Sequence, residues 1–327
     1  MVRSPAVQPL ADLLVVDLTR YLPGAFASRE LLRLGARVVR LEPPQGDPMR
    51  HVATAWEEAL NGGKESVACD LKADPELAHA LLERADVVLE GFRPGVAARL
   101  GVGPHDVPET VIYCSITGFG ADGPHAARAG HDLNYLGWAG VLEDTAPGLP
   151  PLQLADLAAG ALGAVVEVLA ALVERERTGR GARLTISMTH GSHRLISHRL
   201  GGDPLPRFLT GGLACYRIYE TADGRWLTVG ALEPKFFIRL CEVIGRPELA
   251  QRQLDPDEQE ALGAELAATF AARTLDDWLR LFDGEDVCVG PVATLAEGAE
   301  AFGGGTGLPS AAVGQHTAQW RAELGFS

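Results

Sequence analysis

Three side chains that could move protons stand where the sequence predicts that structural elements begin. His131 precedes Asp132-Leu-Asn-Tyr135, Asp156 precedes a long apolar stretch, and Glu233 lies between an expected strand and an expected helix. Taken singly, His131 is more often a structural histidine, with Asp132 as a helix cap, and a carboxylate at a helix start accepts hydrogen bonds from free backbone N–H groups. Together, one imidazole and two carboxylates are the equipment for general acid–base chemistry.

A second group of side chains could bind an anion. Arg40 ends an expected strand, Arg93 lies in a short Gly-Phe-Arg-Pro-Gly segment, Arg99 follows it, and Lys64 and Lys72 could add to the set. Most arginines are solvated surface charges. At strand ends, however, arginines also clamp phosphate groups, because the guanidinium matches two phosphate oxygens at once. These basic residues are therefore either solvated surface charges or a local positive patch that binds phosphate.

The overall charge limits the possible partners. The chain has 327 residues, with 29 Lys and Arg against 43 Asp and Glu, so its formal net charge is −14. Non-specific nucleic-acid binding needs clustered basic residues, so we exclude it as a function. An anionic small ligand is still possible, because a few local arginines outweigh distant charge. The length and a hydrophobic content of 46% indicate a soluble globular protein of about two domains.

Several motifs argue against other chemistries. Gly118-Phe-Gly-Ala-Asp-Gly123 fits the glycine spacing of a dinucleotide site, but Pro124 follows and no apolar helix opens, so a glycine loop is the favoured interpretation. The sequence contains no zinc-protease, Walker, serine-hydrolase or calcium-loop motif. The five cysteines form no CxxC pair, which predicts neither a metal site nor a disulfide framework.

The elements that must position these residues can be predicted from the apolar pattern. Continuous apolar strands alternate with helical patterns in the first half, which predicts a parallel sheet covered on both faces. The strands are expected at 13–18, 37–41, 65–70, 86–90 and 111–116, with helices at 25–34 and 75–85.

The pattern changes after about Thr185, and residues 192–212 are interpreted as a linker between domains. A hairpin is expected at 215–219 and 226–229, helices at 235–244, 258–272 and 275–282, and a strand at 287–292. The apolar stretch Leu157–Val173 contains Glu167, so we interpret it as a buried helix and expect no membrane span. Residues 1–14 show no signal-peptide pattern, which favours a cytoplasmic location.

These residues occur in motifs that resemble the family III CoA-transferases (the CaiB/BaiF type), and within them the α-methylacyl-CoA racemases. The matching segments run from about Leu10 to Val292. They include Val16-Asp-Leu18, Leu34-Gly-Ala-Arg-Val-Val-Arg-Leu-Glu-Pro-Pro44, Gly46-Asp-Pro48, Phe92-Arg-Pro-Gly95, Ile116-Thr-Gly-Phe-Gly-Ala-Asp-Gly-Pro124, Ala129-Gly-His-Asp-Leu-Asn-Tyr135, Leu154-Ala-Asp156 and Val229-Gly-Ala-Leu-Glu-Pro234.

The resemblance implies a fold and an assembly. It implies an α/β protein with a large Rossmann-like CoA-binding domain, residues 1–195 with 300–327 returning to it, and a linker with a smaller α+β domain at 196–299. It also implies an interlaced homodimer in which two chains thread through each other, with each active site between the large domain of one subunit and the small domain of the other. The tail is short for this family, and His190 stands where an acidic residue is usual.

The resemblance also assigns roles to individual residues. It implies that His131 and Asp156 are the two bases of a racemase, that Glu233 is the partner of the histidine, and that Arg40, Arg93 and Arg99 hold CoA phosphates. Lys64, Gly118 and Tyr135 are the further residues expected to bind CoA. No permanently bound cofactor is expected, since the CoA thioester is the substrate.

The leading hypothesis is therefore an enzyme that epimerises the α-carbon of a 2-methylacyl-CoA or a related acyl-CoA, with a role in lipid metabolism. The first alternative is a CoA-transferase that moves CoA between carboxylic acids, with Asp156 as nucleophile forming a mixed anhydride. The second alternative is a CoA-binding protein without catalysis. Backbone N–H groups at the start of the helix after Asp156 are expected to stabilise the thioester oxyanion.

Overall fold

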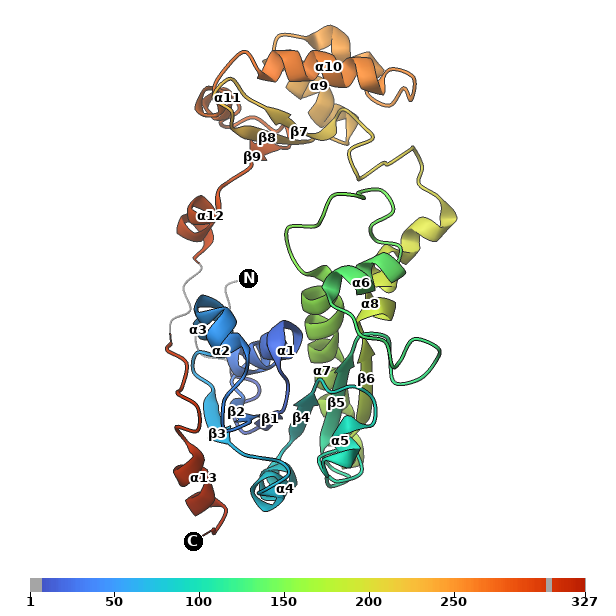
Figure 1. Ribbon diagram of the computed structural model, residues 1–327. Coiled ribbons are helices and arrows are strands. Elements are labelled where there is room, and N and C mark those ends of the chain that lie inside the picture. The colour runs from blue at the N-terminus through green and yellow to red at the C-terminus, as the bar shows by residue number, and fades with distance from the viewer. Residues whose placement is uncertain (1–7, 304–307, 327) are drawn as a thin grey trace. The chain divides into compact units, whose positions relative to one another are not determined.

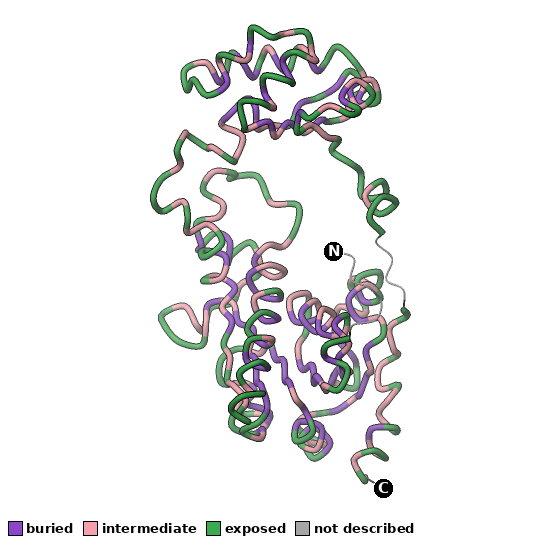
Figure 2. The backbone as a smooth tube through the Cα atoms, turned by 180° about the vertical axis from the view of Figure 1, so that it is seen from behind, coloured by how far each residue is buried: buried purple, intermediate pink, exposed green. Residues whose placement is uncertain are grey.

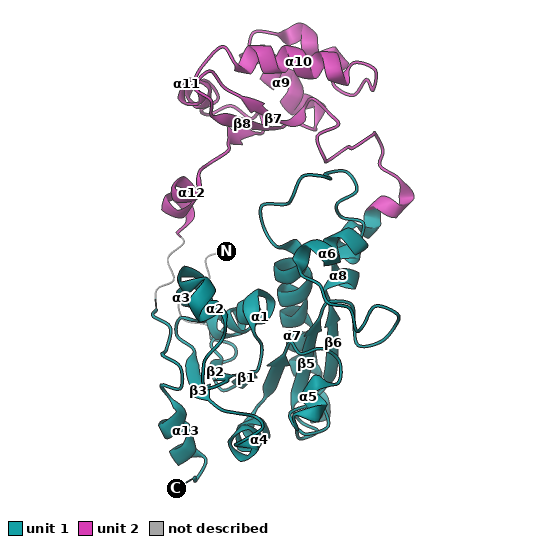
Figure 3. Ribbon diagram, in the orientation of Figure 1, with its two compact units in different colours: residues 1–198, 305–327 teal, residues 199–304 magenta. Residues whose placement is uncertain are grey.

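The computed structural model describes residues 8–303 and 308–326 (Figure 1). Its contacts divide the chain into two compact units, residues 1–198 with 305–327 (unit 1) and residues 199–304 (unit 2) (Figure 3). These bounds differ by a few residues from those expected from the sequence. Residues 1–7, within the segment examined for a signal peptide, and most of the expected glycine turn at 303–305 lie outside the described residues.

Unit 1 contains a six-stranded sheet in which every strand pair is parallel, in the order β3-β2-β1-β4-β5-β6. The strands are β1 Leu14–Asp17, β2 Arg37–Glu42, β3 Glu65–Ala68, β4 Val87–Glu90, β5 Ile112–Thr117 and β6 Arg183–Ser187. The predicted α/β class with a parallel sheet is confirmed. The strand order reverses between β1 and β4, and in doubly wound sheets ligands bind at the carboxyl ends of the strands at that point.

Helices cover both faces of this sheet. They are α1 Tyr21–Arg33, α2 Met49–Val52, α3 Thr54–Asn61, α4 Pro75–Arg84, α5 Val96–Arg99, α6 Asp132–Trp138, the π-helix η1 Ala155–Leu162, α7 Gly163–Thr178, α8 Met188–Ile196, the 3₁₀ helix η2 Ser197–Gly201, which crosses the unit boundary, and α13 Thr317–Glu323.

The two-residue period of the strands explains why both faces are covered. Val15 and Val38 pack in one core cluster with α1, η1 and α7, whereas their neighbours Val16 and Val39 pack in another with α4, α5 and Trp320 of α13. Successive strand residues point to opposite faces, so an uninterrupted apolar run needs two covers. Figure 2 shows the buried residues gathered along these strands.

The long apolar stretch noted in the sequence forms η1 and α7, which continue into each other. Residues Ala155–Thr178 have the length and hydropathy to cross a membrane, but 39% of the apolar window is buried in the protein. Ala164 and Val168 are fully buried against the sheet, whereas Leu162, Val166 and Val173 are exposed on the opposite side. This packing is that of a core helix with one uncovered apolar face.

The last described segment, residues 308–326, returns to unit 1 and lies along β3. The backbone N–H of His316 donates to the carbonyl of Ser66 at 2.9 Å, and the Ser66 N–H donates to Nδ1 of His316 at 3.1 Å. Thr317 Oγ1 accepts the N–H of Ala68 at 2.9 Å. The segment therefore occupies the backbone groups of an edge strand that would otherwise be open.

Unit 2 is built on a three-stranded antiparallel sheet in the order β7-β8-β9. The elements are β7 Tyr216–Glu220, β8 Trp226–Gly230, α9 Pro234–Val243, the 3₁₀ helix η3 Pro247–Arg252, α10 Gln259–Phe270, α11 Leu275–Leu281, β9 Val289–Pro291 and α12 Leu295–Phe302. The predicted hairpin and the three helices after it occur at the expected places. Its own core packs Phe237, Leu266 and Trp278 together.

Candidate active site

A cavity of about 480 Å³ opens at the carboxyl edge of the parallel sheet of unit 1. Its walls come from the segments that follow three strands: residues 19–24 after β1, residues 91–94 after β4, and residues 116–118 at the end of β5. Residues of the 126–135 segment, together with Asp156 and Met188, complete the lining. The cavity therefore lies where β1 and β4 adjoin, the point at which the strand order reverses.

Asp156 reaches this cavity from the first turn of the π-helix η1. A π-helix is rare and is frequent at functional sites, because its wider turn displaces a side chain from the regular helix face. The expectation that Asp156 caps the helix is wrong, since Leu154 is the N-cap. The expected oxyanion site is also wrong: the N–H of Asp156 donates to Asp132 Oδ1 at 2.9 Å, and that of Leu157 to Gln153 O.

His131 reaches the same cavity from the N-cap position of α6. Its backbone N–H donates to Oδ1 of Asn134 at 3.0 Å, which holds the start of the helix in place. The helix begins at Asp132, so Asp132 is not its cap as expected; its carboxylate contacts Asp156 instead. The structure thus brings the two predicted bases, His131 and Asp156, onto the lining of one cavity.

Gly118 and Tyr135 support this arrangement. Both line the cavity, and a Cβ on Gly118 would lie 2.5 Å from the ring of Tyr135, so only glycine fits. The Tyr135 hydroxyl donates to the carbonyl of Gly130 at 2.5 Å, next to His131. The loop 118–123 leads into turns rather than a helix, so it does not form a dinucleotide fingerprint. Its close packing against α6 explains the glycine.

The carboxyl group of Asp156 titrates far from its ordinary range. Burial, together with the neighbouring carboxylate of Asp132, raises its pKa from 3.8 to about 7. A carboxyl group with this pKa is present in both the protonated and ionised forms near neutral pH. Asp156 can therefore act either as an acid or as a base in this cavity.

Three guanidinium groups line the cavity: Arg20, Arg93 and Arg128. Arg93 and its neighbours follow β4, and Arg128 lies with its Cζ 5.2 Å from the ring centre of Trp138. Arg99, in contrast, lies exposed on α5 and outside the residues that line the cavity. Of the predicted phosphate-binding arginines, the structure therefore places only Arg93 at this site.

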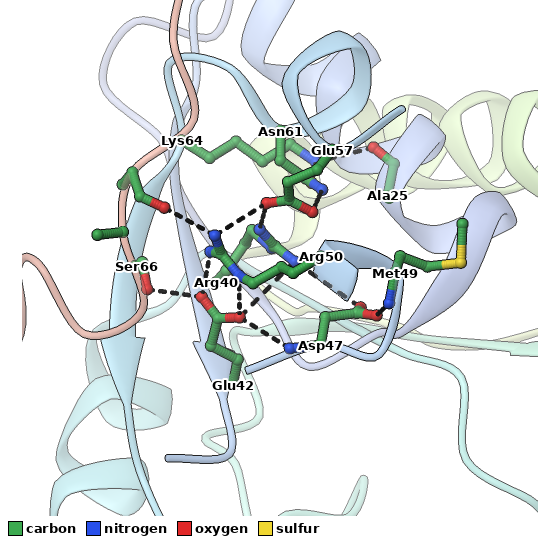
Figure 4. A network of polar contacts seen from close by, with 12 residues as sticks. Ala25, Arg40, Glu42, Asp47, Met49, Arg50, Glu57, Asn61, Lys64 and Ser66 are labelled. Atoms are coloured by element: carbon green, nitrogen blue, oxygen red, sulfur yellow. Dashed lines mark hydrogen bonds and ion pairs between the residues drawn. The ribbon is translucent and has the colours of Figure 1, made fainter. Parts of the chain in front are cut away.

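Arg40 is buried rather than available at the surface. β2 extends two residues beyond it, so Arg40 lies inside the strand, with 5% of its surface exposed. Its guanidinium is paired with Glu57 at 2.5 Å, Asp47 at 3.7 Å and Glu42 at 3.9 Å (Figure 4). A phosphate that contacts Arg40 would have to compete with these buried carboxylates, so the role of Arg40 as a phosphate clamp stays a prediction.

Lys64 is also internal. Its ammonium donates to Ala25 O at 2.8 Å, Ser28 Oγ at 2.7 Å and Asn61 Oδ1 at 2.8 Å, and it lies 3.9 Å from Asp17. The side chain is fully buried, and burial lowers its pKa to about 7. Lys64 therefore joins α1 to α3 in this structure, and its expected contact with CoA stays a prediction.

A second cavity, of about 350 Å³, adjoins the first and shares Thr19, Arg20 and Phe92 with it. Lys72 lines this second cavity, together with residues 41–45, which form the end of β2 and the segment after it. The two cavities follow the carboxyl edge of the sheet, which leaves room for a ligand longer than either cavity alone.

Glu233 belongs to unit 2. It is exposed and stands at the N-cap of α9, after the last residue of β8, and its carbonyl accepts the N–H of Phe236 at 3.0 Å. Its carboxylate makes no capping hydrogen bond. Glu233 thus presents a solvent-facing carboxylate on the smaller unit.

Within residues 8–303 and 308–326, no group of three or more His, Cys, Asp or Glu side chains could hold a metal ion. The five cysteines are free, and four of them are buried.

Sequence reasoning did not single out Arg20 and Arg128, and it gave Asp132 a different role. Arg20 follows the end of the first strand by three residues, a position that could have suggested it. Arg128 lies in a segment without regular structure, so no periodicity indicated which way it points. The contact between Asp132 and Asp156 spans 24 residues and had no signal in the sequence.

Comparisons with known proteins agree with this geometry. The sequence model of CoA-transferase family III matches residues 10–301. The chain is 36% identical over 307 residues to the α-methylacyl-CoA racemase of Homo sapiens, covering 88% of this chain and 78% of that one. It is 30% identical over 324 residues to the succinyl-CoA:glutarate CoA-transferase of Mus musculus, covering 89% and 74%.

Solved structures show the same fold. A crystal structure of a CAIB/BAIF family protein from Brucella suis superposes with a TM-score of 0.83 at 27% sequence identity, covering 97% of this chain and 99% of that one. On the strength of the matched sequence, the shared fold and the cavity at the switch point, the chain belongs to CoA-transferase family III.

Proposed function

We propose that this protein epimerises the α-carbon of a 2-methylacyl-CoA or a closely related acyl-CoA. The observation that carries the proposal is that His131 and Asp156, an imidazole and a carboxyl, line one cavity of unit 1. Inversion of a carbon centre needs a base on one face of the carbon and an acid on the other. The similarity to the racemases of Homo sapiens and Mus musculus supports the same assignment.

The proposed reaction takes two proton transfers. One of the two groups removes the proton on the α-carbon, and the electron pair of the C–H bond moves into an enolate of the thioester. The other group then donates a proton to the opposite face, which restores the C–H bond with inverted configuration. Since burial keeps part of Asp156 protonated near neutral pH, it can serve as the acid for one enantiomer and as the base for the other.

The CoA portion would be held by the guanidinium groups at the same edge of the sheet. Arg20, Arg93 and Arg128 line the cavity and can each form charge-assisted hydrogen bonds to phosphate oxygens. The adjoining cavity shares Arg20 and extends along the carboxyl ends of the strands. This arrangement explains how an acidic chain could bind an anionic ligand, because the charge that matters is local.

Glu233 completes the proposed site as the partner of His131, in a homodimer in which each site combines unit 1 of one protomer with unit 2 of the other. The uncovered apolar face of η1 and α7, with Leu162, Val166 and Val173 exposed, supports burial by a second copy. A cytoplasmic location and a role in lipid metabolism complete the proposal.

A CoA-transferase is the second candidate. The similarity to a succinyl-CoA:glutarate CoA-transferase favours it, as does the presence of Asp156 at the cavity. In that reaction the ionised carboxylate attacks the thioester carbonyl, CoA leaves, and an acyl-aspartyl anhydride forms. The raised pKa of Asp156 is compatible with this reaction too, because part of the carboxyl is ionised near neutral pH.

Hydrogen exchange separates the two reactions. One enantiomer of a 2-methylacyl-CoA is incubated with the protein in D₂O without an acceptor acid. Deuterium uptake at the α-carbon, with formation of the other enantiomer, supports epimerisation. Absence of uptake together with CoA transfer to an added carboxylic acid would overturn it. CoA binding with neither activity would identify a non-catalytic binding protein.

Two variants test the residues. His131→Ala is expected to abolish epimerisation and to permit CoA transfer if that activity exists. Asp156→Ala is expected to abolish both reactions, and retained epimerisation in this variant would refute the assignment of the bases. CoA binding by each variant, measured by calorimetry, serves as the control that the cavity is intact.

A further inference from the structure

The side chain of Asp132 links the two proposed bases, although it does not line the cavity itself. Asp132 follows His131 directly and stands at the first position of α6. Its Oδ1 accepts the backbone N–H of Asp156 at 2.9 Å, across 24 residues of sequence. One carboxylate thus joins the start of the helix that carries His131 to the start of the helix that carries Asp156.

This hydrogen bond replaces one that the helix could not form. The first N–H groups of a helix have no partner within it, and a π-helix, with its wider turn, leaves more of them free. Asp132 accepts the hydrogen bond of the backbone N–H of Asp156, the candidate base. A hydrogen bond from a backbone N–H to an ionised carboxylate is short and strong, so it restricts the backbone that carries the Asp156 side chain.

The same contact has an electrostatic consequence. The carboxylate of Asp132 raises the pKa of Asp156 in the same direction as burial, because a nearby negative charge disfavours ionisation of a second carboxyl. Within the described residues, the Asp156 carboxyl has no hydrogen-bond or ion-pair partner of its own. Asp132 can therefore influence the protonation state of Asp156.

The other charged groups near η1 line the same cavity as Asp156, line a separate hollow or are paired with other residues. Arg20, Arg93, Arg128, His131 and Tyr135 line the cavity together with Asp156. On the helices packed against η1, Glu167 of α7 and His190 of α8 line a separate hollow, and Glu30 of α1 is paired with Arg29 and Arg33. Among the described residues, Asp132 is the one whose carboxylate touches the Asp156 backbone.

We propose that Asp132 is a positioning residue for Asp156: its carboxylate holds the Asp156 backbone N–H and so fixes the start of the helix that carries this base. The role in catalysis rests on the proposed epimerase function, since an epimerase needs Asp156 as an acid in one direction.

Two substitutions separate the hydrogen bond from the charge. Asp132→Asn retains an oxygen that can accept the Asp156 N–H but removes the negative charge, whereas Asp132→Ala removes both. Asp122→Asn is the matched control, because it removes the same charge from an exposed position of the 118–130 loop. The titration of Asp156 is followed by NMR of protein labelled with ¹³C at the aspartate carboxyl carbons, and Asp156→Asn identifies its resonance.

The titration does not depend on the protein being an epimerase. In Asp132→Asn we expect the midpoint of the Asp156 titration to move to lower pH by about one unit, the size of a like-charge effect at a partly buried site. Asp122→Asn is expected to leave the midpoint unchanged. A midpoint in Asp132→Asn equal to that of the unmodified protein would overturn the proposal, whatever reaction the protein catalyses.

The kinetic readout is the pH profile of deuterium exchange. In the Asp132→Asn variant, the part of the pH profile that follows the ionisation of Asp156 is expected to move to lower pH. Little change in KM is expected. Asp132→Ala is expected to lower kcat about tenfold, the loss of one charge-assisted hydrogen bond of roughly 1.4 kcal/mol. Equal kcat values in Asp132→Ala and the unmodified protein would refute the positioning role. Absence of exchange in the unmodified protein would refute the epimerase function and leave the titration as the test of Asp132.

Discussion

Replacing Asp156 by asparagine is expected to abolish epimerisation and, at neutral pH, to stabilise the folded protein. The reason is that the ionised carboxyl is unfavourable where it lies: burial raises its pKa from 3.8 to about 7, and Asp132 contributes in the same direction. Within the described residues its carboxyl oxygens have no hydrogen-bond donor that the amide would lose. Asparagine has nearly the same shape and carries no charge.

The size of the effect follows from linkage. The native state holds the proton more tightly than the unfolded state, so stability falls as the pH rises from about 4 to about 7. Each pKa unit corresponds to about 1.4 kcal/mol, so the ionised carboxyl destabilises the native state by at most about 4 kcal/mol above pH 7. Asp156 is only partly buried, and solvent screening reduces this figure to about 2 kcal/mol.

Urea unfolding at pH 4.5 and at pH 8, at matched protein concentration, measures the difference. We expect the free energy of unfolding of the asparagine variant to exceed that of the unmodified protein by about 2 kcal/mol at pH 8. At pH 4.5, where the native carboxyl is already protonated, we expect a much smaller difference. Asp122→Asn serves as the control and is expected to show no such dependence on pH. An increase in the free energy of unfolding that is equal at both pH values, or no increase at pH 8, would refute this explanation.

Four further substitutions test the surroundings of the site. Lys64→Met removes three buried hydrogen bonds and the ammonium group that lies 3.9 Å from Asp17, so we expect urea unfolding to show that the free energy of unfolding falls by about 3 kcal/mol. Arg93→Ala is expected to weaken CoA binding about tenfold in calorimetry and to reduce its salt dependence. Arg99→Ala should have little effect, because Arg99 lies outside the cavity. Gly118→Ala places a Cβ 2.5 Å from the Tyr135 ring and is expected to lower kcat, with the thermal midpoint also reduced.

Much of the sheet could be predicted from the sequence, because continuous apolar runs have few other stable solutions. The run at 13–18 forms β1, and its valines alternate between two cores. β6 was not predicted, since Arg183–Ser187 is an edge strand with polar, exposed residues between its apolar ones. α8 was not predicted either: its glycine and histidines have weak helix propensity, and its stability comes from packing against η1 and α6.

The candidate site was predicted unevenly for a related reason. His131 and Asp156 could be named because each begins an element that the sequence makes visible. The burial of Arg40 could not be predicted, because it depends on where β2 stops and on carboxylate partners from segments without a clear pattern. Side-chain burial depends on contacts between distant segments, and spacing along the chain does not report them.

The path of residues 308–326 along β3 also bears on how the protein is made. Contacts such as those of Ser66 with His316 and Gly314 join positions 250 and 248 residues apart, so the open edge of β3 is covered only when almost the whole chain has left the ribosome. Until then, an unpaired strand edge is exposed to other nascent chains, which is a hazard for aggregation. Synthesis that stops before this segment would therefore yield a chain whose sheet is formed but whose β3 edge stays open to a neighbouring molecule.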